Sequence, residues 1–276
     1  ERKTMITVTK EHFSPGQILS SGQCFRMEEV KEGGWELVAG DRYLKIEETE
    51  EANAFRFHCG EEELRDFWGP YFDLEEDYGA YKKRIDPADA YLVRAADFGG
   101  GIRILRQDLW EMIVTFIISQ QNNIRRIRKN VQFLAKRYGR RCVSDEGKVY
   151  YSFPGPGELA QATEADLRAG GLGYRSRYIR KTVEMVLGGQ VDLEALEGMD
   201  YPSARAELMR LCGVGGKVAD CICLFALHHL EAFPVDTHIK KVLDEQYPEG
   251  FPFERYAGFQ GVLQQYIFYY DLHGRH

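Results

Sequence analysis

The stretch from Leu211 to Ile239, LCGVGGKVADCICLFALHHLEAFPVDTHI, places a lysine just after a glycine turn and an aspartate nineteen residues further on. Glycines such as Gly213 and Gly215 let the backbone reverse within two or three residues. A helix that starts after such a turn keeps the amides of its first turn free. Those amides and the helix dipole suit an anion such as a phosphate. The stretch therefore predicts two helices joined by a tight hairpin.

A similar hairpin is expected earlier in the chain. Gly171-Leu172-Gly173 lies between a helix that begins at Thr163 and another that covers Arg175–Leu187. One Gly-apolar-Gly turn is common as a plain connection between helices. Two of them in one helical chain, beside a basic segment, favour phosphate binding.

Lys217 is expected in the first turn of a helix that runs to about His228. A positive charge at this position is unfavourable by about 0.3–1 kcal/mol. The same potential favours the uncharged amine, which is the form that attacks as a nucleophile. The alternative is an ordinary surface lysine. Cys221 follows four residues later on the same helix face, so the two side chains are expected to line one pocket.

Asp236 is expected to be the N-cap of a helix from Thr237 to about Tyr247. A carboxylate at a helix start can also stabilise a developing cation or steer a proton, and the two roles are compatible. Together, Lys217 and Asp236 suit chemistry at a sugar C1′, where the transition state resembles an oxocarbenium ion.

Charge is distributed unevenly along this acidic chain, whose formal net charge is −7. Residues 28–77 hold 17 acidic and 5 basic side chains, whereas residues 102–142 hold 10 basic and 2 acidic side chains. A basic face can therefore exist on an acidic protein, so nucleic acid is not excluded as a partner. A solvated basic helix is the alternative interpretation.

The pattern of apolar residues predicts an α+β protein. Short alternating segments at Trp35–Ala39, Tyr43–Ile46 and Ala54–His58 predict antiparallel strands, and no strand-like alternation is expected after Leu64. Asp108, with Glu111 three residues later, predicts a capping box at the start of a buried helix. We expect an N-terminal β-sheet domain with trailing helices over residues 1–104 and a helical domain carrying the active site over residues 105–276.

Composition excludes several other classes. Apolar residues make up 44% of the chain, which argues against disorder, and no apolar run approaches the roughly 20 residues of a membrane span. The six cysteines are scattered without zinc or iron–sulfur spacing, so we expect reduced core thiols. The sequence predicts an intracellular, cytoplasmic monomer without a signal peptide.

Leu211–Ile239 resembles the helix-hairpin-helix Gly/Pro-Asp motif of base-excision DNA glycosylases. Within that superfamily the chain is most similar to the 8-oxoguanine DNA glycosylases. The similarity continues in the same order along nearly the whole chain, at Ser20–Arg26, Gln121–Ile124, Gly171–Arg175 and Phe268–Leu272.

The resemblance implies a bifunctional DNA glycosylase and AP lyase that excises 8-oxoguanine from duplex DNA. Lys217 would attack C1′, expel the base and form a Schiff base that undergoes β-elimination, while Asp236 would stabilise the sugar cation. The flipped base would bind in a pocket that sandwiches it, reads its Watson–Crick edge and accepts the N7–H that guanine lacks. The residues implied for this pocket are Cys221 and Phe268 for the sandwich, Gln264 for the edge and the carbonyl of Gly22 for N7–H.

The resemblance also implies contacts with DNA and with an ion. The implied DNA-binding residues are Asn123, Arg126, Tyr174, Arg175, Gly213, Gly215 and His238. The carbonyls of Met209, Leu211 and Val214 match those that hold Na⁺ or K⁺ at the hairpin, and no other cofactor is implied. Gln121 departs from the three asparagines of vertebrate members, so the preferred opposite base stays open.

Related functions remain as alternatives. The endonuclease III and adenine-glycosylase branches carry a four-cysteine iron–sulfur loop after this motif, yet no cysteine follows Cys223. The alkyladenine branch lacks the hairpin lysine, so Lys217 argues against it. A non-catalytic module that uses both hairpins as phosphate clamps is the alternative from a different class.

Overall fold

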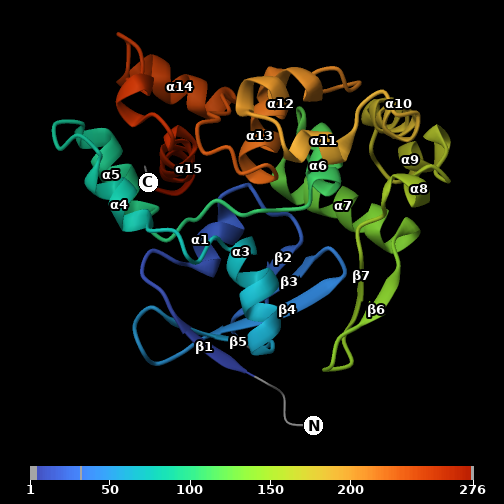
Figure 1. Cartoon of the computed structure of the whole chain (residues 1–276), viewed down its shortest axis with the longest axis horizontal. Helices are drawn as coiled ribbons and strands as arrows, with labels where there is room; N and C mark the ends of the chain where they lie inside the picture. Colours follow the sequence, from blue (N-terminus) through green and yellow to red (C-terminus); the bar gives the residue numbers. More distant parts are fainter. Residues whose placement is uncertain (1–4, 32, 275–276) are drawn as a thin grey trace.

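The computed structural model describes residues 5–31 and 33–274, which form a β-sheet region and a larger helical region (Figure 1). The sheet has five antiparallel strands in the order β1-β5-β4-β3-β2. They span Ile6–Thr9 (β1), Met27–Glu29 (β2), Trp35–Ala39 (β3), Arg42–Glu48 (β4) and Ala54–Phe57 (β5). The expected antiparallel sheet is confirmed.

Alternation along the strands gives the sheet its own core. In β3, Trp35, Leu37 and Ala39 are buried, and they lie opposite Ile46, Leu44 and Arg42 of β4. Side chains of alternate residues point to one face, so each strand contributes to one apolar layer. Helix α3 and the segment before it cover that layer, and Trp68 and Phe72 are fully buried there.

Helices make up most of the rest of the chain, and α13 and α6 lie at the centre of the helical region (Figure 1). The early helices are α1 (Pro15–Ser20), α2 (Glu61–Glu63), η1 (Leu64–Trp68), α3 (Gly69–Tyr71), α4 (Tyr78–Lys83) and α5 (Ala90–Phe98). The middle helices are α6 (Leu109–Ser119), α7 (Ile124–Tyr138), α8 (Pro156–Leu159), α9 (Glu164–Ala169), α10 (Arg175–Leu187) and α11 (Leu193–Glu197). The last are α12 (Tyr201–Leu208), α13 (Gly216–Phe225), α14 (Thr237–Gln246), η2 (Phe253–Tyr256) and α15 (Gln260–His273).

The expected helix starts at Asp108, Thr163 and Asp236 are confirmed, because each side chain accepts a backbone N–H of the first turn. The capping box expected at Asp108 is only half present. The Glu111 carboxylate lies 3.4 Å from Arg26 rather than on the cap. Burial raises the pKa of Glu111 to about 6, although Arg26 opposes that shift.

The expectation that no strand follows Leu64 is wrong. Residues Arg141–Val143 (β6) and Val149–Tyr151 (β7) form an antiparallel hairpin that descends beside the sheet (Figure 1). Each strand has only three residues, so its own alternation is too short to recognise. The hairpin is fixed by contacts with the sheet region, where Arg140 lies 2.7 Å from Asp41 and the Tyr150 hydroxyl donates to the Asp41 carbonyl.

Helices α4 and α5 come early in the sequence but lie beside α14 and α15 (Figure 1). Leu92 and Ala95 of α5 are buried in the helical core, not in the core of the sheet. The expected domain boundary between residues 104 and 105 remains a prediction. None of the helices in the described chain combines the length and apolar composition that crossing a membrane requires.

Candidate active site

One pocket brings together Lys217, Asp236 and the four residues expected to hold the base. Its lining comes from the turn after α1, from α6, from α13, from the segment before α14 and from α15. The lining residues are Ser21, Gly22, Phe116, Lys217, Cys221, Phe225, Pro234, Asp236, Gln264, Gln265 and Phe268. The chain therefore places the predicted nucleophile, carboxylate and base-binding residues around a single space.

Lys217 lies in the first turn of α13, as expected. The rest of α13 is buried from Val218 to Phe225, so the helix is held in the core, and Lys217, Cys221 and Phe225 reach the pocket from it. The Lys217 ammonium lies 5.8 Å from the centre of the Phe116 ring, which stacks on Phe225. The stacked rings of Phe116 and Phe225 thus line the pocket beside the Lys217 amine.

Cys221 lies one turn after Lys217 and is buried. Burial raises the pKa of its thiol to about 11, Lys217 opposes this shift, and Asp236 adds to it. The charges of Lys217 and Asp236 therefore both act on the Cys221 sulfur. At neutral pH Cys221 is a neutral thiol and forms an apolar wall.

Asp236 caps α14, and its Oδ1 accepts the N–H of Ile239 at 2.8 Å. Its second oxygen remains available to the pocket that it lines. Next to it, His238 is half-exposed, its Nδ1 lies 3.1 Å from Asp271, and its ring packs edge-on against Phe268 at 5.9 Å. The cap thus fixes the carboxylate at the mouth of the pocket.

Gly22 and Phe268 are in close contact across the pocket. Gly22 has a φ of +76°, and a Cβ built on it would lie 3.0 Å from the Phe268 ring. The pocket has a volume of about 50 Å³. A cavity of roughly 150 Å³ is needed to hold benzene. The pocket as it stands is therefore too small for a purine, and the contact between Gly22 and Phe268 is one place where it is narrow.

The two glycine hairpins differ in how their amides are used. In the first, the amides of Arg175 and Ser176 donate to the carbonyls of Leu172 and Gly173, both at 3.2 Å. The expectation of free amides is therefore wrong for α10. In the second, the amides of Gly216, Lys217 and Val218 make no hydrogen bond within residues 5–31 and 33–274, so they are free as expected.

Different structural constraints apply to the two glycines of the second hairpin, Gly213 and Gly215. Gly213 has a φ of +83°, and a Cβ there would lie 2.6 Å from the Tyr178 ring. Gly215 has an ordinary extended backbone, and a Cβ there would contact nothing within 4 Å. Packing inside the protein explains Gly213 only. The bare backbone at Gly215 leaves room for a group from outside.

Four of the residues expected to contact DNA, Asn123, Arg126, Tyr174 and Arg175, lie around the loop between α6 and α7. Asn123 caps α7 by accepting the N–H of Arg126 at 2.9 Å, and Arg126 donates to the Gly171 carbonyl at 3.3 Å. Arg175 is buried, and its guanidinium donates to the Gln120 carbonyl and, at 3.0 Å, to that of Gln121. Arg175 thus holds the loop from beneath.

Tyr174 covers the outside of the same loop. Its side chain is 42% exposed, and its ring lies 4.6 Å from the Arg175 guanidinium. Gln121, in the same loop, is exposed and has a φ of +46°, a conformation that costs a non-glycine residue about 1–3 kcal/mol. Strain at an exposed loop residue suggests a function, and the sequence carried no signal of it beyond the departure from asparagine.

The carbonyls expected to hold a monovalent cation lie just before α13. The Leu211 carbonyl accepts the N–H of Val214 at 3.2 Å. Within residues 5–31 and 33–274, the carbonyls of Met209 and Val214 accept no hydrogen bond, and the cation site remains a prediction. Across the same ranges, no group of three or more His, Cys, Asp or Glu side chains could hold a metal ion.

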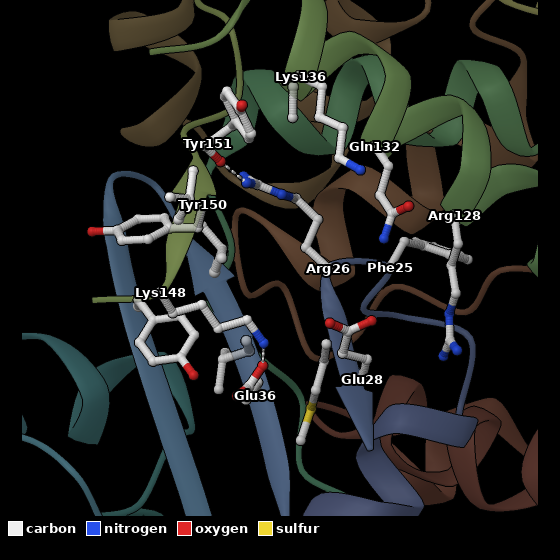
Figure 2. Close-up of a pocket in the computed structure, with 16 residues that line it drawn as sticks. Phe25, Arg26, Glu28, Glu36, Arg128, Gln132, Lys136, Lys148, Tyr150 and Tyr151 are labelled. Carbon is white, nitrogen blue, oxygen red and sulfur yellow. Dashed lines mark hydrogen bonds and ion pairs between the residues drawn. The ribbon is translucent and has the colours of Figure 1, made fainter. Parts of the chain in front are cut away.

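A second cavity, of about 200 Å³, lies between β2, β3, α7 and the β6–β7 hairpin. Figure 2 shows Arg26 reaching the Tyr151 carbonyl there and Lys148 meeting Glu36. It shares no lining residue with the Lys217 pocket. These contacts join the hairpin to the sheet.

Five residues of the Lys217 pocket were not expected from the sequence: Ser21, Phe116, Phe225, Pro234 and Gln265. Phe116 belongs to the apolar pattern of α6 and carries no separate signal. Ser21 and Gln265 each neighbour an expected pocket residue, and only contacts over long sequence distances bring them to the pocket.

Comparison with known proteins agrees with this arrangement. Residues 5–113 match the family model "8-oxoguanine DNA glycosylase, N-terminal domain". Residues 114–248 match the model "HhH-GPD superfamily base excision DNA repair protein".

Curated relatives match over most of the chain. The N-glycosylase/DNA lyase of Saccharomyces cerevisiae is 30% identical over 88% of this chain and 70% of its own length. The N-glycosylase/DNA lyase OGG1 of Arabidopsis thaliana is 32% identical over 80% of this chain and 63% of its own length. The chain thus spans less than two thirds of the plant relative.

A solved structure matches over its whole length. The 8-oxoguanine glycosylase/lyase of Clostridium acetobutylicum, in complex with double-stranded DNA containing cytosine opposite 8-oxoG, superimposes with a TM-score of 0.90. It is 32% identical, and the match covers 99% of each chain. With the family models and the yeast relative, this shows that the chain belongs to the 8-oxoguanine DNA glycosylase family of helix-hairpin-helix N-glycosylase/DNA lyases.

Proposed function

We propose that this chain is a bifunctional DNA glycosylase and lyase that excises 8-oxoguanine from double-stranded DNA. The observation that carries the proposal is the shared pocket of Lys217, Asp236, Cys221, Gln264 and Phe268, which come from separate elements. The names of the yeast and clostridial relatives support the same activity.

In the proposed first step, the Lys217 amine forms a bond to C1′ of the damaged nucleotide. The glycosidic bond breaks, and the base leaves with the bonding electron pair. Asp236 stabilises the positive charge that develops on the sugar ring. Its cap to Ile239 holds the carboxylate in place during this step.

The proposed second step breaks the strand. The sugar ring opens to give a Schiff base between Lys217 and C1′. Loss of the C2′ proton then expels the 3′ phosphate by β-elimination, with the protonated imine as the electron sink. Hydrolysis of the imine releases the free lysine for another cycle.

The damaged base is proposed to lie between Cys221 and Phe268 after Phe268 has moved away from Gly22. The Gly22 carbonyl would accept N7–H, which 8-oxoguanine has and guanine lacks, and Gln264 would contact the Watson–Crick edge. Leaving that carbonyl without its partner costs about 1–3 kcal/mol, which favours 8-oxoguanine over guanine.

DNA is proposed to contact the second hairpin through a phosphate, while residues around the α6–α7 loop contact the gap left by the everted base and the base opposite it. The open amides after Gly215 support a phosphate site, and Na⁺ or K⁺ at the Met209, Leu211 and Val214 carbonyls would add positive charge beside it. The other proposed contacts are Gly213, Asn123, Arg126, Tyr174, Arg175 and His238. Since one chain supplies every residue of the pocket, we propose a monomer, and an intracellular location is proposed because the substrate is DNA.

Borohydride trapping tests the nucleophile. Borohydride reduces an imine to a stable amine, so wild-type protein should become covalently joined to a duplex that carries 8-oxoguanine. Lys217→Gln should bind the duplex but neither nick nor trap it. Lys240→Gln, which removes an exposed lysine paired with Asp244, is the matched control and should trap normally. Trapping by Lys217→Gln would remove Lys217 from the mechanism.

The Asp236→Asn variant tests whether excision needs the negative charge of Asp236 or only its role as the N-cap of α14. Asparagine caps helices as well as aspartate does, so the melting temperature should stay unchanged. Excision should fall by about 100-fold or more, because an electrostatic contact to the transition state is lost. Unchanged turnover would mean that Asp236 is only a cap.

Excision assays with each of the four bases opposite 8-oxoguanine would define the preferred pair.

A further inference from the structure

Three buried glutamines form a hydrogen-bonded chain behind the proposed base pocket. Gln23 Nε2 donates to Gln265 Oε1 at 3.4 Å, and Gln265 Nε2 donates to Gln264 Oε1 at 3.1 Å. Gln264 Nε2 then donates to the Pro234 carbonyl at 2.9 Å. The three glutamines are 0%, 3% and 4% exposed for Gln23, Gln265 and Gln264. Every bond in the chain runs in the same direction, from N–H to oxygen.

Backbone groups fix that direction at both ends. Gln23 Oε1 accepts the Leu105 N–H at 2.9 Å, and its Nε2 donates to the Arg103 carbonyl at 2.9 Å. At the other end, the Pro234 carbonyl can only accept. Reversing any one amide would bring two oxygens or two N–H groups together. Gln23 Nε2 also donates to Ser21 Oγ at 3.0 Å, so its 3.4 Å contact with Gln265 is the weakest link of the chain. Backbone atoms therefore fix Gln23 and Gln264 directly, and Gln265 lies between these two amides.

This arrangement leaves Gln264 with a defined set of free groups. A glutamine amide has two N–H donors and two acceptor sites on its oxygen. Pro234 takes one donor and Gln265 fills one acceptor site. One N–H and one lone pair remain, and Gln264 lines the pocket. The free N–H and the free lone pair of Gln264 match a heterocycle edge that carries an acceptor next to a donor.

We infer that Gln265 is a positioning residue that fixes the direction in which the Gln264 amide meets the everted base. The inference rests on the proposed function and adds a specificity residue to it. Without the Gln265 N–H, Gln264 Oε1 loses its buried partner, and only the bond to the Pro234 carbonyl still holds the amide against rotation. A rotated amide would no longer present its free donor and acceptor to the base edge.

Gln265→Met tests this role, because methionine keeps the length and volume of the side chain but removes the amide. The expected result is a roughly tenfold fall in the rate of 8-oxoguanine excision relative to nicking of a duplex with an abasic site, the size of one lost hydrogen bond. Nicking of the abasic duplex needs Lys217 but no base. It therefore reports folded, competent protein in each preparation.

Two further variants separate positioning from general packing. Gln107→Met removes a glutamine of similar burial, 8% exposed, whose Nε2 donates to the Gln23 carbonyl. It should leave the ratio of excision to nicking at the wild-type value. In a double-mutant cycle, Gln265→Met should have little further effect in a Gln264→Met background, because it acts through Gln264.

An unchanged ratio in Gln265→Met, or additive effects in the cycle, would overturn the inference while leaving the proposed function in place. A ratio that falls equally in Gln107→Met would also overturn it, since any buried change would then suffice. Failure of the wild-type protein to excise 8-oxoguanine would overturn the proposed function, and the inference with it.

Discussion

The two glycine hairpins share a sequence pattern, but the backbone amides that follow the turn are hydrogen-bonded in the first and free in the second. Before α10, the N-cap Tyr174 already has helical backbone angles, φ −62° and ψ −21°. The following amides therefore bond back into the turn. Before α13, the N-cap Gly215 is extended, φ −91° and ψ −179°, so the same amides remain open. The conformation of one residue decides whether a Gly-x-Gly turn closes on itself or can receive an anion.

The basic side chains in the first turns of α10 and α13 also differ in burial and in their contacts. Arg175 of α10 is buried and bonded to loop carbonyls, whereas Lys217 of α13 is partly exposed and lines the pocket. The first hairpin thus fixes the loop between α6 and α7. The second hairpin carries the reactive group.

The largest expected difference between the hairpins is in stability. Gly213→Ala combines a φ of +83° with a Cβ 2.6 Å from the Tyr178 ring, so the free energy of unfolding should fall by about 3 kcal/mol. Gly171→Ala has a similar φ of +85°, but its nearest neighbour is Asn130 at 3.4 Å, so about 1 kcal/mol is expected. Urea denaturation of both variants measures the difference, and equal losses would contradict it.

A smaller effect should appear in DNA affinity. Gly215→Ala meets no atom within 4 Å and keeps an ordinary φ, so stability should hardly change. Its methyl group would stand beside the open amides, and affinity for duplex DNA should fall by roughly tenfold if a phosphate binds there. Gly173→Ala, at φ +59°, is the matched control. It should lose about 1 kcal/mol of stability and keep its affinity. Wild-type affinity in Gly215→Ala would place the phosphate elsewhere.

The sequence predicted most where a side chain acts on its own neighbours. Asp108, Thr163 and Asp236 each cap the helix that follows, and that contact spans only three residues. The placement of Lys217 and Cys221 on one helix face is equally local. Such features depend on spacing that is visible in the chain itself.

Features that depend on distant partners could not be predicted. The β6–β7 hairpin is fixed by Asp41, about a hundred positions away in the chain. Gln23 and Gln265 are separated by 242 positions, yet they share a hydrogen bond. The closure of the first hairpin depends on the backbone angles of Tyr174, which its side chain does not reveal. Tertiary contacts decide the first two of these features.

Salt dependence can show what the first hairpin contributes to binding. Arg126 is exposed and its guanidinium donates to the Gly171 carbonyl, so it adds charge beside a hairpin whose amides are already used. If it contacts a phosphate, Arg126→Gln should reduce the slope of log affinity against log salt by about 1. The control is Arg168→Gln, which removes an exposed arginine paired with Glu164. An unchanged slope in Arg126→Gln would leave the first hairpin with a structural role alone.

The smallest expected effect concerns the thiol beside the reactive amine. Burial raises the pKa of Cys221 to about 11 even though Lys217 opposes the shift, so the thiolate is scarce at pH 8. Iodoacetamide at pH 8 should therefore modify the partly exposed Cys142 and spare Cys221, as peptide mass spectrometry would show. Labelling should rise as the pH approaches 11. Rapid labelling of Cys221 at pH 8 would mean that the second hairpin activates the thiol as well as the amine, and the apolar wall proposed for the base would then be a charged one.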